Sequence, residues 1–269
     1  MMLEIKDISK NYGEKCALNH INLTLTGGVY GLLGPNGAGK STLMNIITDN
    51  LQPDKGEVLW DGVPVRKMGA AYRSMLGYAP QQQGLYEAFT GRRFLSYMGT
   101  LKKIPGKEMK AEISRVAESV NLVQMLDKPI GSYSGGMKQR LLVAQAMMGD
   151  PKLMIMDEPT AGLDPKERVR IREKIKELSE GKIILVATHV VSDIQSIAKE
   201  IIILKSGNLV DQDTVANLCS KYAPVERIGG LSPNHLENAS ASVQEGLYQI
   251  DDLEQVYMHI FGEEERFHV

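Results

Sequence analysis

The sequence predicts an α/β fold built on a largely parallel sheet with helices on both faces. Two observations lead to this prediction. Short, continuously apolar segments, typical of strands buried on both faces of a sheet, occur at 29–34, 152–159 and 182–189, and segments with helical spacing alternate with them. Between about 84 and 150 the strand-like segments disappear and helical segments follow one another, which predicts a helical insert.

The chain ahead of the insert is predicted to be mostly β-structure. Strands are expected at 3–13, 21–28, 29–34 and 75–80. The first two alternate apolar and polar side chains, as half-buried strands do. A glycine-rich loop and a helix over 40–50 follow the third strand, and 56–65 is predicted to form a hairpin around Asp61 and Gly62.

The insert and the chain after it complete the predicted alternation. Helices are expected at 90–103, 106–122, 135–150 and 190–199, and strands at 152–159, 182–189 and, as a pair, within 200–210. A further helix is expected to begin at Pro165, with Asp164 as its N-cap. Residues 241–250 fit a strand, and 253–262 fit a closing amphipathic helix.

The size and charge of the chain limit its organisation and its partners. A chain of 269 residues holds one large domain or two modest ones, and we expect a large domain over 1–213 and a small C-terminal extension over 214–269 that ends in a helix. Lys and Arg number 31 and Asp and Glu number 33, so the net charge is −2. This balance argues against nucleic-acid binding through bulk electrostatics.

Membrane and export signals are also absent from the sequence pattern. No segment approaches the roughly 18 apolar residues that span a bilayer, and the N-terminus carries charges where a signal peptide needs an apolar block. We expect a chain that neither spans a membrane nor is exported by itself, while docking on a membrane protein stays open. Cys16 and Cys219 fit no metal or disulfide spacing, which suggests a reducing compartment.

The stretch GPNGAGKST fits the phosphate-loop pattern G-x-x-x-x-G-K-[ST] and lies between a predicted strand and a predicted helix. Its glycines let backbone N–H groups turn toward phosphate oxygens, and the helix N-terminus adds a positive dipole end. Lys40 can neutralise β- and γ-phosphate charge, and Ser41 can ligate Mg²⁺. The alternative is a plain glycine turn before a helix. The candidate nucleotide-binding residues are Gly34, Pro35, Asn36, Gly37, Ala38, Gly39, Lys40, Ser41 and Thr42.

The stretch LMIMDE supplies acidic partners for such a loop. A buried strand delivers Asp157 and Glu158 at its C-terminal end, where open parallel sheets bind their ligands. Asp157 would hold Mg²⁺, directly or through water, and Glu158 would polarise a water at the γ-phosphate. The alternative is that this acidic pair caps the next turn.

A second stretch, YSGGMKQR, combines a hydroxyl and two glycines ahead of an apolar helix, which is the composition of an anion cradle. Phosphate loop, acidic strand and SGG helix together, in this order, resemble the ATP-binding cassette (ABC) ATPases over about 3–210. The signature motif of that family is LSGGQ, and YSGGM stands where it belongs, shortly upstream of LMIMDE. The resemblance implies a P-loop NTPase core with a mainly parallel sheet, an antiparallel β-subdomain and the helical insert, so that 1–213 would be the ABC ATPase domain.

The resemblance places further site residues. Tyr12 looks like the aromatic residue that stacks on adenine, and Gln81 like the Q-loop glutamine that senses Mg²⁺ and the membrane partner. Asp164, at the end of AGLD, is similar to the D-loop aspartate, and His189 is similar to the switch histidine at the γ-phosphate.

Each of these residues also has a plainer interpretation. Tyr12 would be an aromatic residue at a strand end, Asp164 a helix cap, and His189 a structural histidine. The helix cap is compatible with the D-loop role. Gln82 and Gln83 leave the register of the Q-loop glutamine open, although Gln81 directly follows Pro80, which favours it.

The resemblance also implies an arrangement of two chains. In this family two cassettes pack head to tail around two ATPs, and the signature loop of one completes the site built by the phosphate loop of the other. Ser134, Gly135 and Gly136 would contribute a hydroxyl, backbone N–H groups and a helix dipole. Met137 replaces the Gln of the motif and Tyr133 its Leu. Because the donors aimed at phosphate are Ser134 and the backbone, we expect activity to survive, while a loss of affinity or of signal to the membrane partner stays open.

The expected role is an ATP- and Mg²⁺-dependent transport ATPase. One cassette without a membrane span implies separate transmembrane subunits, a second cassette (a homodimer is expected) and a peripheral position on the cytoplasmic face of the membrane. Residues 81–89 would form the groove that receives the coupling helix of those subunits; the alternative is that their apolar side chains serve ordinary packing of the insert. The end of the chain, LEQVYMHIFGEEE, resembles ABC-2 type exporter cassettes, which favours export of a drug, peptide or lipid-like cargo. The alternatives are an importer cassette and a soluble ABC ATPase of translation or DNA repair; no nucleic-acid partner is expected.

Overall fold

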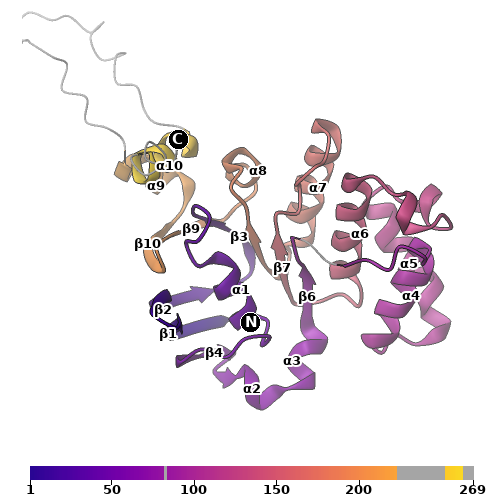
Figure 1. Cartoon of the computed structure of the whole chain (residues 1–269), viewed down its shortest axis with the longest axis horizontal. Coiled ribbons are helices and arrows are strands. Elements are labelled where there is room, and N and C mark those ends of the chain that lie inside the picture. Colours follow the sequence, from indigo (N-terminus) through magenta and orange to yellow (C-terminus); the bar gives the residue numbers. More distant parts are fainter. Residues whose placement is uncertain (82–83, 223–251, 263–269) are drawn as a thin grey trace, which may run out of the picture. The chain divides into compact units, whose positions relative to one another are not determined.

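The computed structural model describes residues 1–81, 84–222 and 252–262. The chain divides into two compact units, Met1–Gln212 and Asp213–Val269 (Figure 1). The first unit contains both sheets and the helical insert. The second contains helices α9 (Val215–Tyr222) and α10 (Leu253–Phe261), which pack on each other. The closing helix expected at 253–262 is therefore confirmed, while the strand considered at 241–250 lies outside the described residues.

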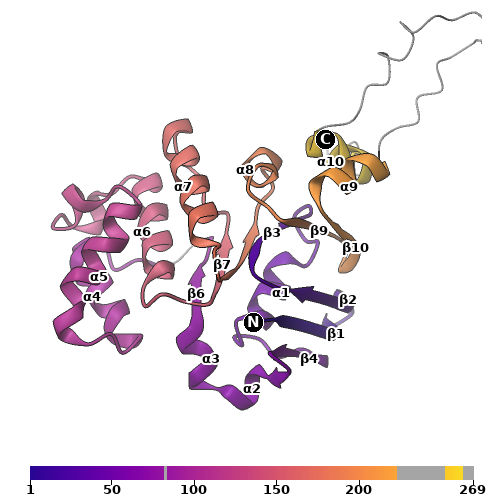
Figure 2. The ribbon, with the colours of Figure 1, turned by 180° about the vertical axis from the view of Figure 1, so that it is seen from behind.

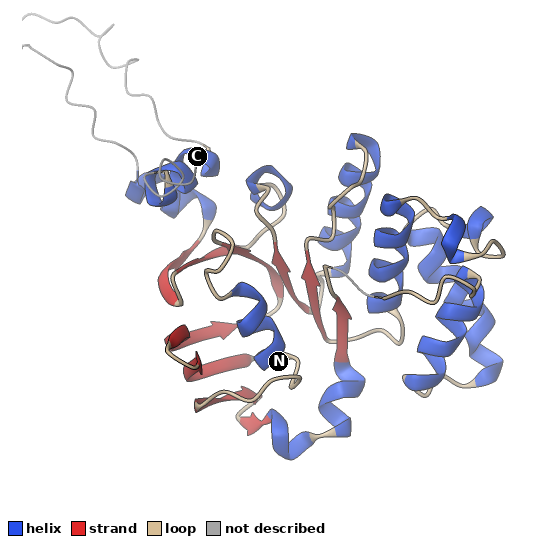
Figure 3. Ribbon diagram, in the orientation of Figure 1, coloured by secondary structure: helices blue, strands red, loops and turns tan. Residues whose placement is uncertain are grey.

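Figure 3 shows how strands and helices alternate along the first unit. Its strands are β1 (Leu3–Tyr12), β2 (Lys15–Leu25), β3 (Gly28–Leu33), β4 (Lys55–Trp60), β5 (Val63–Pro64), β6 (Leu76–Ala79), β7 (Leu153–Asp157), β8 (Ile183–Ala187), β9 (Glu200–Lys205) and β10 (Asn208–Asp213). Its helices are α1 (Lys40–Ile47), α2 (Val65–Met68), α3 (Ala70–Met75), α4 (Gly91–Leu101), α5 (Gly106–Ser119), α6 (Gly135–Met147), α7 (Pro165–Leu178) and α8 (Val191–Gln195), with 3₁₀ turns at Val123–Met125 and Ile130–Ser132.

The larger sheet has the strand order β10-β9-β3-β8-β7-β6. All pairings from β9 across to β6 are parallel, which confirms the predicted sheet. Because these strands run the same way, the carboxyl ends of β3, β7 and β8 lie side by side at the same end of the sheet. The order β3-β8-β7 makes β8 the direct neighbour of two strands: β3, which leads into the predicted phosphate loop, and β7, which leads into the acidic pair.

The two faces of this sheet carry different helices, as predicted. On one face Tyr30, Ile155 and Leu185 lie in register and share a buried cluster with Leu43 and Ile47 of α1. On the other face the backbone lies so close to α8 that a Cβ atom on Gly31 would meet Ile194 at 2.6 Å. A Cβ on Gly77 of β6 would likewise meet the carbonyl of Ala146 in α6, so glycine is required where these helices pack.

The second sheet is antiparallel, with the order β2-β1-β4-β5. Its residues join the same buried cluster as α1, which therefore packs between the two sheets (Figure 2). The predicted hairpin is confirmed, because Asp61 and Gly62 turn the chain from β4 to β5 with φ values of 47° and 79°. This pair of left-handed residues is the turn that tight hairpins prefer.

Two features of this part of the chain differ from the sequence expectation. Strand β2 begins at Lys15 rather than near Ile21. Its alternation is hidden because the register against β1 shifts between Ile5 and Ile8 and again after Ile8, and His20 has a φ of 52°. Helices α2 and α3 were not predicted from the sequence, because each is too short to show a helical period.

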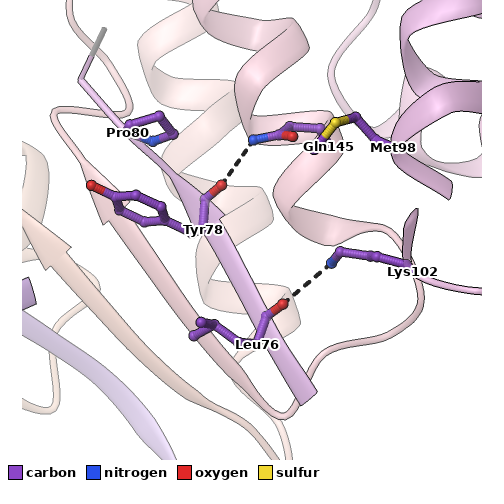
Figure 4. Close-up of a pocket in the computed structure, with 6 residues that line it drawn as sticks. All are labelled: Leu76, Tyr78, Pro80, Met98, Lys102 and Gln145. Atoms are coloured by element: carbon purple, nitrogen blue, oxygen red, sulfur yellow. Dashed lines mark hydrogen bonds between the residues drawn. The ribbon is translucent and has the colours of Figure 1, made fainter. Parts of the chain in front are cut away.

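The insert protects the exposed edge of the larger sheet. Strand β6 is the edge strand, and side chains of the insert bond the carbonyls that no strand pairs (Figure 4). Gln145 Nε2 donates to Tyr78 O at 2.9 Å, and Lys102 Nζ donates to Leu76 O at 3.4 Å and to Met148 O at 2.7 Å. This satisfies backbone groups that would otherwise be a template for association with another strand. In the described residues no helix is long and apolar enough to cross a bilayer.

Candidate active site

The phosphate-loop pattern occupies the turn from β3 into α1. Gly39 is the N-cap of α1 with a φ of 105°, and a Cβ atom there would meet Ala17 O at 2.5 Å. A Cβ on Gly34 would meet the carbonyl of Leu204. Glycine is therefore required at both ends of the loop. The first N–H groups of α1, which have no partner within the helix, open into the loop, and Ser41 and Asn36 are exposed there.

Lys40 lies inside this loop. Its Nζ donates to the carbonyls of Gly34 and Pro35. Burial lowers the pKa of Lys40, and the nearby carboxylates of Glu158 and Asp157 oppose that shift. The ammonium group thus lies near the two acids at the end of β7.

Asp157 ends β7 and is buried, in register with Ala187 of β8. Burial raises the pKa of this carboxyl to about 6; Glu158 adds to the rise and Lys40 opposes it. An ionised carboxylate here lacks enough positive charge around it. The site therefore favours an additional cation.

Every polar group of Glu158 has a hydrogen-bond partner. Its N–H donates to Ala187 O at 2.8 Å and its carbonyl accepts from Gln139 Nε2 at 2.9 Å. Its carboxylate accepts from Thr188 Oγ1 at 3.0 Å and from the His189 N–H at 2.9 Å, and lies 2.7 Å from His189 Nδ1. The Glu158 side chain is 7% exposed and that of His189 65%, so the imidazole connects a buried carboxylate to solvent.

The signature stretch lies at the start of α6. Ser134 is the N-cap, and its Oγ accepts from the Met137 N–H at 3.2 Å. Gly135 is exposed and Gly136 half-buried. Tyr133 is buried, and its hydroxyl donates to Met125 O at 2.6 Å, so this residue anchors the insert instead of lining the loop.

The remaining predicted residues lie around these loops. Asp164 Oδ1 accepts from the Glu167 N–H at 3.0 Å, which confirms the predicted cap of α7. Tyr12, at the end of β1, is 52% exposed. Gln81 follows β6 and lines a cavity of about 430 Å³ together with Gly135.

The structure therefore brings some predicted residues together and leaves others apart. One group gathers at the carboxyl ends of the parallel strands: Lys40, Asp157, Glu158 and His189. Among the described residues, no hydrogen bond joins the signature loop to the phosphate loop. Two sets of predicted phosphate ligands thus exist on one chain without a direct link.

Sequence reasoning missed two groups of residues that support the site. One is Gln139, which is buried. Its signal in the sequence is an amide side chain at a core-facing position of an apolar helix. The other surrounds Asp193 of α8, which is 6% exposed. Its Oδ2 accepts from Thr160 Oγ1 at 2.6 Å and from Arg168 at 3.1 Å, and Arg172 lies 3.6 Å from its Oδ1. This cluster joins α7 and α8 to the loop after Glu158.

Comparison with known proteins identifies the family. The sequence model of a family described as "ABC transporter" matches residues 18–161, more than half of the chain. The chain belongs to the ABC transporter family. The cassette is 33% identical to "Nod factor export ATP-binding protein I" of Rhizobium meliloti, covering 97% of this chain and 81% of the relative. It is 35% identical to "Linearmycin resistance ATP-binding protein LnrL" of Bacillus subtilis, covering 82% and 71%.

Solved structures resemble the cassette as well. An ATP-binding subunit of an ABC transporter superposes with a TM-score of 0.76 at 27% identity, covering 82% of this chain and 93% of that one. A dimeric cassette in a post-hydrolysis state, bound to ADP and Pi, gives a TM-score of 0.72 at 27% identity and covers 79% and 98%. The predicted fold class and family are confirmed. The cassette is an ATPase that binds ATP, and proteins of this kind dimerise and work with transmembrane subunits.

Asp157→Asn should stabilise the nucleotide-free cassette at neutral pH. Because the folded pKa of Asp157 is raised from 3.8 to about 6, the folded state holds this proton when the unfolded chain has lost it. The wild type therefore loses stability as pH rises from about 4 to about 6, and the loss persists above that window. The amide avoids this loss, so the gain in melting temperature over wild type should grow from pH 4 to about pH 7. An equal gain at both ends of this range would contradict the shifted pKa.

Asp193→Ala should destabilise the cassette by about 2 kcal/mol or more, because two arginines and Thr160 lose a buried carboxylate partner. Chemical denaturation measures the free energy of unfolding. The matched control is Asp127→Ala, which removes the exposed ion pair with Arg92 and should cost less than about 1 kcal/mol. Equal losses in the two variants would show that the Asp193 cluster does not stabilise the fold.

Proposed function

We propose that this cassette is the ATP-hydrolysing subunit of an exporter and that it acts as a homodimer with separate transmembrane subunits on the cytoplasmic face of the membrane. The observation that carries the proposal is the Glu158 carboxylate, buried between Thr188 and His189 beside Lys40 and Asp157. This geometry provides a base, a cation and a metal-ligating acid behind a phosphate loop. The family membership supplies the substrate, ATP.

The buried Asp157 carboxylate, whose pKa is raised, would be stabilised in its ionised form by a cation, and we assign Mg²⁺ to this role. In the part of the chain that the structure describes, no three His, Cys, Asp or Glu side chains gather into a metal cage. A hard cation would therefore need phosphate oxygens as further ligands, which is how Mg²⁺ binds in phosphoryl-transfer sites. Ser41, Asp157 and Gln81 are the protein groups proposed to hold it. When bound, it would neutralise charge on the phosphate oxygens.

Hydrolysis would follow from the carboxylate of Glu158. This carboxylate takes a proton from a water molecule while the water oxygen forms a bond to the γ-phosphorus. The bond between the γ-phosphorus and the bridging oxygen breaks, which gives ADP and phosphate. Lys40 offsets the phosphate charge, and His189, at the solvent-exposed end of the carboxylate, orients the reacting groups.

The signature loop would act on the nucleotide of a second copy. Ser134 Oγ, the N–H groups of Gly135 and Gly136 and the N-terminus of α6 form an anion-binding surface without a cation. A lysine from the partner's phosphate loop would supply the charge. Met137 uses its backbone N–H toward Ser134, so loss of the glutamine side chain leaves these donors in place.

Three further residues complete the proposed nucleotide site. Tyr12, exposed at the end of β1, would stack on adenine, and its neighbour Lys10 has its Nζ 5.9 Å from the ring centre. Asp164 would act at the cassette interface while it caps α7. Gly37, Ala38 and Thr42 would complete the loop around the phosphates.

An aromatic surface made by Tyr86, Phe89 and Tyr97 supports docking to a transmembrane subunit. Tyr86 stacks on Phe89 at 4.9 Å and meets Tyr97 edge-on at 6.1 Å, and Arg93 lies 4.0 Å from the Phe89 ring. Tyr86 and Tyr97 remain exposed. Exposed aromatic and arginine side chains are typical of protein interfaces. We assign this surface to the coupling helix of the membrane partner.

Export is favoured because the names of two relatives refer to Nod factor export and linearmycin resistance. A drug, peptide or lipid-like molecule is the cargo class proposed for this cassette. The alternatives are an importer cassette and a soluble ABC ATPase. The net charge of −2 disfavours nucleic acid as a partner.

Glu158→Gln should abolish hydrolysis while keeping ATP binding. The amide preserves the shape of the side chain but cannot take the proton, so the ATPase rate should fall by about 100-fold or more. The ATP-bound dimer should then persist and be seen by size-exclusion chromatography. Glu173→Gln, an exposed change on α7, is the control. A Glu158→Gln cassette with the wild-type rate would exclude Glu158 as the base.

A further inference from the structure

The backbone of Glu158 adopts a conformation that needs support. Its φ is 49°, in the left-handed region that residues with a Cβ atom rarely occupy. Such conformations persist where the surroundings determine them, and they gather at functional sites. Its N–H donates to Ala187 O at 2.8 Å, and its carbonyl accepts from Gln139 Nε2 at 2.9 Å and from the Ala161 N–H at 3.1 Å.

These bonds come from different parts of the chain, and the one from Ala161 closes the turn directly after Glu158. The bond to Ala187 continues the pairing of β7 with β8 and belongs to the sheet. The bond from Gln139 comes from α6, the helix that begins with the signature loop. Gln139 is 6% exposed and lies one helical turn after Gly135, so a rigid element separates the two by about 6 Å of axial rise.

We propose that Gln139 is a positioning residue for ATP hydrolysis, which ties the signature helix to the main chain of the hydrolytic glutamate of the same chain. The inference rests on the proposed role of Glu158 as the base. Removal of the Gln139 donor leaves the Glu158 carbonyl with only the local bond from the Ala161 N–H, and it removes the bond that ties this left-handed backbone to α6. The carboxylate then leaves the orientation in which it meets water, whereas the phosphate loop keeps its contacts.

This link has a consequence for the dimer. The N-terminus of α6 is proposed to bind the γ-phosphate held by the partner's phosphate loop, and Gln139 connects that same helix to Glu158 of its own site. A phosphate bound at one site thus fixes the position of the base at the other. Packed secondary-structure elements carry coupling of this kind between sites, and α6 is buried from Leu141 to Met147.

The test compares Gln139→Met and Gln139→Glu in the full chain. Methionine keeps length and volume without the N–H donor, and glutamate places a second acceptor against the carbonyl. We expect kcat to fall about tenfold or more in the methionine variant and further in the glutamate variant, with the KM for ATP within about twofold of wild type. A merely structural role would not produce this split.

Gln145→Met is the matched control. Gln145 lies on the same helix, is 5% exposed and donates the same kind of bond, to Tyr78 O at 2.9 Å, but it supports β6 instead of Glu158 (Figure 4). Melting temperatures of all variants show whether each one folds. If both methionine variants lose the same kcat, or if Gln139→Met keeps the wild-type kcat, the proposal is overturned.

Glu158→Gln, measured beside them, separates the two levels of the account. If it is inactive while Gln139→Met is fully active, the positioning role fails and the base assignment stands. If Glu158→Gln retains the wild-type rate, the proposed base is wrong, and so is the inference built on it.

Discussion

The register of β8 between β3 and β7 is the constraint on which the site depends. Ala187 pairs with Leu32 of β3 on one side and with Asp157 of β7 on the other. Phosphate loop, acidic pair and His189 therefore emerge in one row at the sheet edge. The Ala187 carbonyl then accepts from the Glu158 N–H, which extends the row by one residue. A shift of one residue in either pairing would move these side chains to the opposite face.

Electrostatics explains why this row acts on a nucleotide. Lys40, Asp157 and Glu158 are partly or fully buried in one place, and burial shifts the pKa of both Lys40 and Asp157 toward the neutral form. A bound phosphate would give the lysine an anion, and a bound cation would give the aspartate a counterion. Burial of these two charged groups costs free energy in the nucleotide-free cassette, and ligand binding would offset this cost. The Glu158 carboxylate, with all its hydrogen bonds made, stays in place.

Local patterns in the sequence predicted the parts of the site that follow directly on strands. The phosphate loop, the acidic pair and His189 each come immediately after an apolar strand, and the cap of α7 and the hairpin at Asp61 rest on one or two residue types. The sheet order could not be read this way, because pairing of distant strands leaves no local pattern.

The contacts that support the site were beyond sequence reasoning for the same reason. Gln139 meets Glu158 across 19 residues, and Arg168 meets Asp193 across 25. These bonds depend on how α6 and α7 pack against the sheet, and a glutamine or an arginine has the same appearance in a sequence whether it is buried or exposed. Tyr133 was considered only as a departure from a motif, although its hydroxyl holds the insert together.

We propose that each hydrolytic site is shared between two chains. A Lys40→Ala chain and a Ser134→Arg chain, each inactive alone, should recover ATPase activity when mixed. The mixed dimer contains one site with an intact Lys40 from one chain and an intact Ser134 from the other. Steady-state ATPase assays of the separate and mixed chains measure this. Recovery on mixing is the predicted result, and a mixture as inactive as its components would contradict the shared site.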